Sequence, residues 1–275
     1  RVWARFSDSV QKPNWVITPY ARYSEMDFLM HFLPGAPVEE NGQNSLGFQS
    51  AYYFHGDQSR WVVGVDGELV DGWLKQYQLN PTDGSAFLQE TIPQGSHYDY
   101  EVTAVQLSPF VQWDYALNEQ WDLSLGLRYE WMQYDYDNLM LAGRTRDDGT
   151  ECGFGGCRYT RPDDSTDDFS NLSPKIGVSY TPMQNQRFYL TLSRGFRAPQ
   201  AVELYRLQRE QSVADLDSEQ LDAVELGYQG STDRWQYEFV LYGMNKRNLI
   251  FRDSDFFNVS SGRTQHMGVD VFAEY

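Results

Sequence analysis

Residues 121–132 read Trp-Asp-Leu-Ser-Leu-Gly-Leu-Arg-Tyr-Glu-Trp-Met, and this stretch decides the fold class. Every second residue from Trp121 to Trp131 is apolar, and the residues between them are charged, small or polar. A period of two predicts a β-strand with one apolar and one polar face. The apolar row is about as long as a tilted strand needs to cross a bilayer, roughly 9–11 residues.

The same alternation recurs elsewhere in the chain, and aromatic residues gather at the ends of the rows. It runs through residues 61–73, 105–115 and 172–180. A soluble β-sandwich also has alternating strands, but a typical soluble strand has only about 5–6 residues. Aromatic residues at both ends of longer rows are typical of the two girdles where a membrane protein meets water. We therefore expect strands that cross a membrane.

The connections between the expected strands alternate between short and long. Short turns are expected near residues 7–13, 56–59, 118–120, 181–186 and 230–233, and long polar segments at residues 34–44, 80–96, 139–170 and 201–218. Short periplasmic turns and long extracellular loops are typical of outer-membrane barrels. The predicted fold class is all-β, an antiparallel up-and-down transmembrane β-barrel, of which this chain supplies about eleven strands. An odd count does not close a standard bacterial barrel, which has an even number of strands.

Composition and charge exclude two classes of protein. The chain has 275 residues, with 22 Lys and Arg against 39 Asp and Glu, and a formal charge of −17. Such an acidic chain has no electrostatic basis for binding polyphosphate, so no nucleic acid partner is expected. Aromatic residues make up 16% of the chain, which argues against disorder. No apolar stretch approaches the roughly 18 residues of a membrane helix.

The two ends of the sequence lie within the alternating pattern. The sequence begins with Arg1, Val2 and Trp3, which resemble the middle of a strand. Apolar and polar residues still alternate over residues 267–275, where the sequence stops. We therefore expect a fragment or a processed piece of a longer barrel. Small and charged residues on the polar face, such as Gly126, suit a wide wet or plugged lumen.

Several motifs after Asn171 carry a resemblance to a known family. They are Asn171–Gly177 (NLSPKIG), Ser193–Pro199 (SRGFRAP), Glu203–Tyr205, Glu219 with Glu225–Gly227, Asn248–Phe251 with Asn258, and His266–Asp270. In order and spacing they resemble the barrel strands of TonB-dependent outer-membrane receptors of the siderophore-receptor type. These receptors are energised importers of iron chelates, haem, cobalamin and some sugars. Residues 1–170 match only in strand and loop layout, and Asp270 stands where the family commonly has Glu.

The resemblance implies a barrel of about 22 strands whose lumen is filled by a plug domain. Residues 1–275 would be a partial receptor barrel, without the plug, its TonB-contacting box or the last strands. The implied partners are a ferric siderophore or similar chelate, the TonB complex through the missing plug, and outer-membrane lipid and lipopolysaccharide of a Gram-negative bacterium. The implied function is TonB-driven import of that scarce solute across the outer membrane, with no cofactor.

Two other functions remain as alternatives. A passive porin-like diffusion channel would lack the plug and would carry rings of opposed charge at a constriction. An enzyme built into a barrel would need a nucleophile or paired acids on one face. Gly-x-Ser-x-Gly, His-Glu-x-x-His and phosphate-cradling glycine loops are all lacking in the sequence. We therefore expect no catalytic residues.

The candidate ligand-binding residues lie in the expected extracellular loops. They are Arg144, Arg146, Arg158, Tyr159, Arg161, Tyr205 and Arg206. Guanidinium groups pair with carboxylate oxygens, so these arginines can hold an anionic ferric chelate. The alternative, which the composition favours, is a solvated loop in which the arginines and neighbouring aspartates compensate each other. Bound Ca²⁺ at the acidic residues is a further, less favoured alternative.

Other residues near the same strand ends have two interpretations. Five tyrosines either stack on a ligand or form the upper girdle, and we favour the girdle: Tyr98, Tyr100, Tyr134, Tyr136 and Tyr159. His31 and His97 are expected to be exposed there. In the family motif Phe196, Arg197, Ala198 and Pro199, the proline should end the strand, and Arg197 should point into the lumen.

Cys152 and Cys157 enclose four residues of one glycine-rich loop. A loop beyond the periplasm lies in an oxidising compartment, so we expect a local disulfide. A zinc site would need two further ligands, and the four histidines are scattered along the chain. No metal site is therefore expected.

Overall fold

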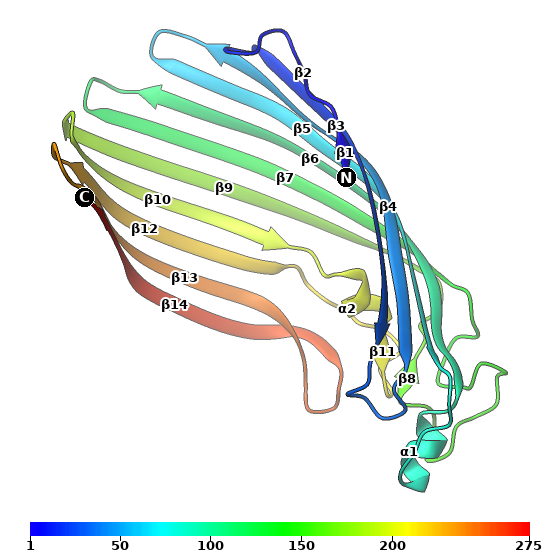
Figure 1. The fold of residues 1–275 in the computed structure, drawn as a ribbon. Helices are drawn as coiled ribbons and strands as arrows, with labels where there is room; N and C mark the ends of the chain where they lie inside the picture. The colour runs from blue at the N-terminus through cyan, green and yellow to red at the C-terminus, as the bar shows by residue number, and fades with distance from the viewer.

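The computed structural model describes all 275 residues as one large curved antiparallel sheet (Figure 1). Its long strands are β3 (Trp15–Leu29), β4 (Val38–His55), β5 (Ser59–Gln78), β6 (Gly95–Ala116), β7 (Trp121–Asn138), β9 (Ser165–Met183), β10 (Gln186–Arg197), β12 (Glu219–Ser231), β13 (Gln236–Arg252) and β14 (Asn258–Glu274). The short strands β1 (Val2–Trp3) and β2 (Phe6–Ser7) both pair with β3, so the sheet has eleven strand positions. The predicted fold class and strand number are confirmed.

The strands follow one another around the sheet in sequence order, as an up-and-down barrel requires (Figure 1). The register places the apolar rows of neighbouring strands side by side. Leu125 on β7 pairs with Ile176 on β9, which in turn pairs with Leu192 on β10. Because side chains alternate between the two faces of a strand, one matched pair keeps the whole apolar row on the same face.

The polar face is the concave one. Arg128 on β7 reaches Asp66 on β5 at 2.8 Å, although β6 lies between the two strands. Tyr189 on β10 similarly donates to Glu238 on β13 at 2.8 Å across β12. Side chains two strands apart meet only where the sheet curves toward them. The apolar rows, such as the one from Trp121 to Trp131, therefore lie on the convex face.

Aromatic side chains stack along the convex face next to the short turns. Trp61 lies 5.4 Å from Trp113, measured between ring centroids. Further along the sheet, the ring centroids are 4.6 Å apart both in the pair Trp121–Tyr180 and in the pair Phe188–Tyr228. This row is the arrangement expected of a girdle at one membrane interface.

The strands extend further into the long-loop end than the sequence predicts. Residues 38–44 belong to β4 and residues 165–170 to β9, although both segments were predicted as loop. Their polar composition favoured a loop prediction. Strand ends that project beyond a bilayer meet water on both faces and therefore lack the apolar row of a membrane-crossing strand. The connection between β13 and β14, residues 253–257, is also short, and it is an exception to the alternation of turn and loop lengths.

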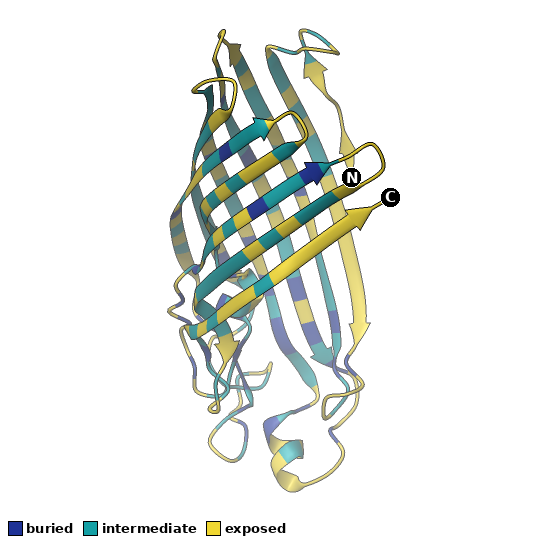
Figure 2. Ribbon diagram, turned by 90° about the vertical axis from the view of Figure 1, so that its left-hand side faces the viewer, coloured by how far each residue is buried: buried dark blue, intermediate teal, exposed yellow.

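Buried residues gather at the long-loop end rather than along the sheet (Figure 2). A cluster of 13 buried apolar residues joins the ends of β5, β6 and β7 to the loops. The loops carry two short helices, α1 (Ala86–Thr91) and α2 (Ala201–Tyr205), and the paired short strands β8 (Tyr159–Thr160) and β11 (Leu207–Gln208). None of the helices has the length and apolar character that crossing a membrane requires.

Candidate functional site at the long-loop end

Three long connections fold together against the concave end of the sheet. They are residues 79–94 with α1, residues 139–164 with β8, and residues 198–218 with α2 and β11. β8 and β11 hydrogen-bond to each other, with Leu207 opposite Thr160. We call this assembly the loop cluster. It joins segments that are far apart in the sequence.

Tyrosines of the sheet form the floor of the loop cluster. Tyr98, Tyr100 and Tyr136 are buried, and the hydroxyl of Tyr98 donates to the carbonyl of Leu207 on β11. The prediction that these three tyrosines belong to an outer girdle is wrong. The register places them on the concave face, beside Leu74 and Val102, where the loops cover them. Tyr134 is half-buried on the same face, and its hydroxyl donates to the carbonyl of Pro199 at 3.1 Å.

Arg161, one of the predicted ligand-binding arginines, is almost completely buried, with 1% of its surface exposed. Its guanidinium donates to the carbonyls of Leu141 at 2.6 Å and Thr145 at 2.8 Å. A longer bond of 3.3 Å reaches the carbonyl of His97. These acceptors belong to one connection, residues 139–164, and to β6 of the sheet. Arg161 therefore ties the loop cluster together and is not open to a ligand.

The two predicted ligand-binding tyrosines are also buried. Tyr159 stacks on His97 with 4.5 Å between ring centroids, and Tyr205 stacks on Tyr136 at 4.2 Å. The hydroxyl of Tyr205 donates to Asp167 at 2.7 Å. Burial, and secondly this hydrogen bond to a carboxylate, raise the pKa of Tyr205 far above its ordinary value. His97 is buried as well, so the expectation that it is exposed is wrong, whereas His31 is exposed.

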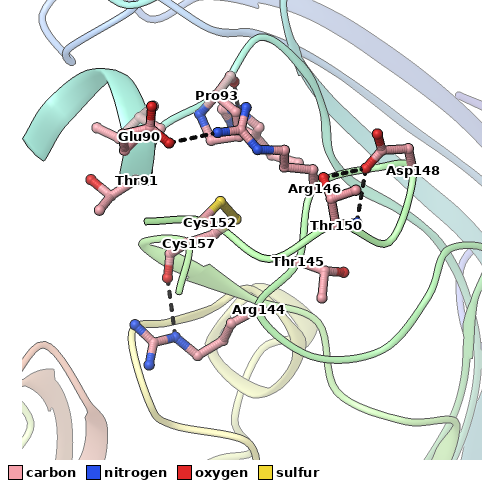
Figure 3. Close-up of a disulfide and its surroundings, with 12 residues drawn as sticks. Glu90, Thr91, Pro93, Arg144, Thr145, Arg146, Asp148, Thr150, Cys152 and Cys157 are labelled. Atoms are coloured by element: carbon pink, nitrogen blue, oxygen red, sulfur yellow. Dashed lines mark hydrogen bonds and ion pairs between the residues drawn. A yellow bond between two sulfur atoms is a disulfide. The ribbon is translucent and has the colours of Figure 1, made fainter. Parts of the chain in front are cut away.

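Arg144 and Arg146 hold the disulfide loop in place (Figure 3). Cys152 and Cys157 are joined by a disulfide, with 5.0 Å between their Cα atoms. Nε of Arg144 donates to the carbonyl of Cys157 at 3.1 Å, and its Nη1 lies 3.4 Å from Glu210. Arg146 pairs with Glu90 on α1 at 2.9 Å. Both arginines therefore have partners within the loop cluster.

Arg206 and Arg158 line a cavity of about 260 Å³ between the loop cluster and the sheet. Arg206 is paired with the buried Glu39 at 2.9 Å and donates to Gln76 at 2.5 Å. Arg158 is half-buried and has no carboxylate within 4.0 Å. Burial, and secondly the charge of Arg209, lower the pKa of Arg158. We call this space the arginine pocket.

The opposite side of the arginine pocket comes from the end of β13 and from the connection that follows it. Arg252 and Phe256 contribute to its lining, and Arg252 has no carboxylate partner. Arg209 lies over the Phe256 ring at 3.8 Å from its centroid, and Arg158 lies 6.0 Å from the same centroid. The lining contains no Asp or Glu. Unpaired guanidinium groups beside an aromatic ring favour an anionic, partly planar ligand.

Sequence reasoning identified Arg158 and Arg206 but missed Arg252, Phe256 and Arg209. The two arginines that it found lie in the long loops, whose composition is unusual. Arg252 ends β13 and Phe256 lies in the short connection after it, 94 and 98 residues beyond Arg158 and 46 and 50 beyond Arg206, and only the folded loop cluster brings them to the pocket. No local pattern in the sequence signals this placement.

The family motif forms a charged network at the end of β10. The strand ends at Arg197, two residues before Pro199, and the register places Arg197 on the concave face beside Glu219. Nε of Arg197 donates to Glu219 at 2.7 Å, and the other two guanidinium nitrogens hold both carboxylate oxygens of Glu203 at 2.9 and 3.1 Å. Glu203 also accepts from the backbone N–H of Gln200, which caps α2.

Two of the motif residues, Phe196 and Ala198, are half-buried at this strand end, and Pro199 is buried. The network therefore fixes the entry of the chain into α2, and through α2 the position of Tyr205. No group of three or more His, Cys, Asp or Glu side chains is placed to hold a metal ion.

Comparison with protein families gives one match. The model of the family described as "TonB dependent receptor-like, beta-barrel" matches residues 3–275. Comparison with curated proteins gives no significant match.

Solved structures with a similar fold include transporters and uptake receptors. The copper transporter OprC has a TM-score of 0.72 and 15% identity, and the match covers 98% of this chain and 43% of OprC. The ferric yersiniabactin uptake receptor FyuA from Yersinia pestis has a TM-score of 0.62 and 13% identity, covering 98% of this chain and 38% of FyuA. The ferric citrate transporter FecA has a TM-score of 0.63 and 14% identity, covering 94% and 36%. The chain thus spans less than half the length of each.

Proposed function

This chain belongs to the TonB-dependent receptor β-barrel family, and from that premise we propose that it is part of the wall of an outer-membrane receptor in a Gram-negative bacterium. In the proposed receptor, residues 1–275 form about half of the barrel, and the plug that contacts TonB lies outside them. The receptor binds a scarce solute at the long-loop end, which faces the outside, and imports it with energy from TonB. The other members with similar structures are transporters or receptors rather than enzymes.

The proposed solute is a ferric siderophore or a similar anionic chelate. The observation that carries this proposal is the arginine pocket, where Arg158 and Arg252 have no carboxylate partner although the chain has a net charge of −17. The similar structures include a ferric yersiniabactin uptake receptor and a ferric citrate transporter. Chelates of this kind present carboxylate or phenolate oxygens, which guanidinium groups bind strongly.

The geometry of the arginine pocket suits one arm of such a ligand. Its volume of about 260 Å³ is below the roughly 300–1,000 Å³ of sites that enclose a whole drug-sized molecule. An anionic arm enters between Arg158 and Arg252, and Phe256 packs against its planar part. Arg206 stays with Glu39 and keeps the wall of the pocket in position. The rest of the chelate would contact other loops and the plug.

Binding by the full receptor tests this proposal. The double variant Arg158→Gln, Arg252→Gln removes the two guanidinium groups that lack a carboxylate partner, and each can form charge-assisted bonds worth about 1.5–3 kcal/mol. We expect the affinity for the recognised ferric chelate to fall at least about tenfold for each arginine. The charge-matched control Arg5→Gln, Arg234→Gln changes two exposed arginines outside the pocket. Equal affinity of both double variants for every anionic chelate in a panel would contradict the proposal.

A passive porin-like channel remains the alternative, because the concave face is lined with charged groups such as Arg128 and Asp66. The two functions differ in their energy requirement. Uptake by the proposed receptor stops when TonB is deleted or the proton gradient is collapsed. Uptake that continues unchanged under both conditions would favour the channel.

A further inference from the structure

His97 is the residue of the arginine pocket that titrates nearest to neutral pH. Only 2% of its surface is exposed, and it lies at the long-loop end of β6, where it shares the pocket with Arg158, Arg206 and Arg252. Guanidinium groups stay charged throughout the physiological range, and burial raises the pKa of both tyrosines in the lining. A change of charge in the pocket between about pH 4 and pH 8 therefore falls to His97.

Hydrogen bonds fix the proton of the neutral His97 ring on one nitrogen. Nε2 lies 2.8 Å from the carbonyl of Pro93, which only accepts, so Nε2 carries the proton. Nδ1 is left as an acceptor and faces Nε2 of Gln76 at 3.4 Å. The amide oxygen of Gln76 accepts in turn from Nη2 of Arg206 at 2.5 Å, and Nη1 of Arg206 pairs with Glu39 at 2.9 Å. Gln76 thus links the ring to an arginine of the pocket.

Positive groups outnumber negative ones around this ring. The charged and titratable groups that face it or share its pocket are Arg158, Tyr159, Arg161 and Asp147 of residues 139–164, Arg206 of residues 198–218, Arg252 of β13 and Tyr98 of β6. Arg161 donates to the carbonyl of His97 at 3.3 Å, and Asp147 accepts from the backbone N–H of Ser96 at 3.1 Å. Burial, opposed by the hydrogen bond to Pro93, lowers the pKa of His97 to about 4, and the charge of Arg161 acts in the same direction as burial. Without a bound anion, the ring is therefore neutral at neutral pH.

An anionic arm in the arginine pocket reverses this balance. A cavity of about 260 Å³ keeps its occupant within a few ångströms of the lining, and His97 belongs to that lining. An opposite charge at such a distance moves a pKa by about 1–3 toward the charged form. The ring then takes up a proton from solvent at Nδ1, where an N–H bond forms and no bond within the protein breaks.

This proton changes the hydrogen bonds between the ring and the arginine. The N–H at Nδ1 and the amide N–H of Gln76 would be two donors facing each other, so the amide turns its oxygen toward the ring. Arg206 loses that acceptor, and its Nη2 becomes available to an oxygen of the bound arm, while Nη1 stays with Glu39. One proton thus adds a positive charge and a guanidinium donor to the pocket.

We propose that the arginine pocket takes up an anionic arm together with one proton, which His97 holds while the arm is bound. This inference rests on the proposed function of the pocket and adds a dependence on pH to it. A group that gains a proton on binding strengthens binding as the pH falls. For a ligand of constant charge, we expect the affinity to rise about tenfold from pH 7.5 to pH 5, as a pKa raised by about 2 requires.

Benzenesulfonate is the probe for this proposal, because it joins a planar ring to a sulfonate that stays ionised over the whole range. Its binding to the full receptor in detergent is measured by titration calorimetry at pH 7.5 and pH 5. Each titration is repeated in two buffers with different heats of ionisation, which counts the protons taken up. We expect most of one proton for each bound probe at pH 5 and almost none at pH 7.5.

Three variants assign the proton. His97→Gln should lose both the proton uptake and the gain in affinity at pH 5, because glutamine does not titrate. The matched control His31→Gln changes an exposed histidine at the same end of the sheet, and it should behave as the unmodified receptor does. Gln76→Glu places a carboxylate between the ring and Arg206, so His97 is already protonated at pH 5 and proton uptake on binding should decrease.

Three results would overturn the proposal, and they separate it from the proposed function. The first is binding that Arg158→Gln, Arg252→Gln abolishes but that takes up no proton at pH 5, which would leave the anion pocket in place without a role for His97. The second is unchanged proton uptake in His97→Gln, which would assign the proton to another group. The third is a lack of binding at both pH values, which would contradict the anion pocket itself and the proton uptake with it.

Discussion

At the residue scale, Arg161 determines whether the loop cluster keeps its shape. Its guanidinium is buried and its hydrogen bonds go to backbone carbonyls of both residues 139–164 and β6. Arg161→Ala leaves several buried carbonyls without a donor, at about 1–3 kcal/mol each. We expect residues 139–164 to become sensitive to protease in intact cells, while the barrel stays heat-modifiable.

A matched change of the unpaired Arg158 serves as its control. Arg158→Ala removes a guanidinium that has no hydrogen-bond partner in the loop cluster, so protease sensitivity should not rise. If Arg161→Ala is as resistant as Arg158→Ala, the loops are held by apolar packing alone.

Tyr205 makes the loop cluster sensitive to alkaline pH. Burial and the hydrogen bond to Asp167 raise the pKa of Tyr205 in the folded protein above its unfolded value of 10.0. The folded state therefore keeps a proton that the unfolded loop loses above about pH 10. The stabilising contribution is full below that pH and decreases as the pH rises above it. Limited proteolysis between pH 7 and pH 11 should show the loops opening only at the alkaline end.

Tyr205→Phe checks the origin of this dependence. It loses the hydrogen bond to Asp167 but cannot ionise, so its loops should open less steeply with rising pH. An identical pH profile in Tyr205→Phe would assign the effect to other groups, such as Tyr159, whose pKa burial also raises.

At the scale of single elements, the disulfide affects only one loop. Cys152 and Cys157 are five residues apart, and loop-closure entropy gives such a small ring about 2 kcal/mol. Cys152→Ser, Cys157→Ser should therefore leave the barrel and its heat-modifiability unchanged. Protease cleavage near residues 147–157 should increase, and mass spectrometry of the fragments measures it. Loss of the folded barrel in this variant would show that the bridge is needed during assembly.

The elements show which features a sequence pattern can reveal. The row from Trp121 to Trp131 predicted β7 correctly, because one face of a membrane strand must be apolar over its whole crossing. Beyond the bilayer neither face of a strand needs to be apolar. Residues 38–44 and 165–170 were therefore predicted as loop although they are strand. Only part of the arginine pocket could be predicted from the sequence, because Arg252 and Phe256 reach it through contacts between segments that are distant in the chain. Burial of Arg161 depends on the same contacts.

At the scale of the whole molecule, the proposed barrel turns its convex face to lipid and its concave face to water. Leu125 and Gly126 are neighbours on β7 that point to opposite faces, and a Cβ at Gly126 has room, with Lys175 the nearest atom group at 3.6 Å. The two cysteines of residues 1–275 are bridged to each other, so a new thiol in these residues can be followed against the receptor that lacks it. These positions allow a direct test of the barrel.

We expect Gly126→Cys to react with a hydrophilic maleimide in isolated outer membranes and Leu125→Cys to stay unreacted. Lipid shields the convex thiol, whereas the polar lumen admits the reagent to the concave one. Both thiols should react after denaturation, which controls for their presence. Reaction at both positions in intact membranes would mean that β7 has water on both faces, as in a soluble β-sandwich. Reaction at Leu125→Cys alone would mean that the two faces of the sheet are reversed.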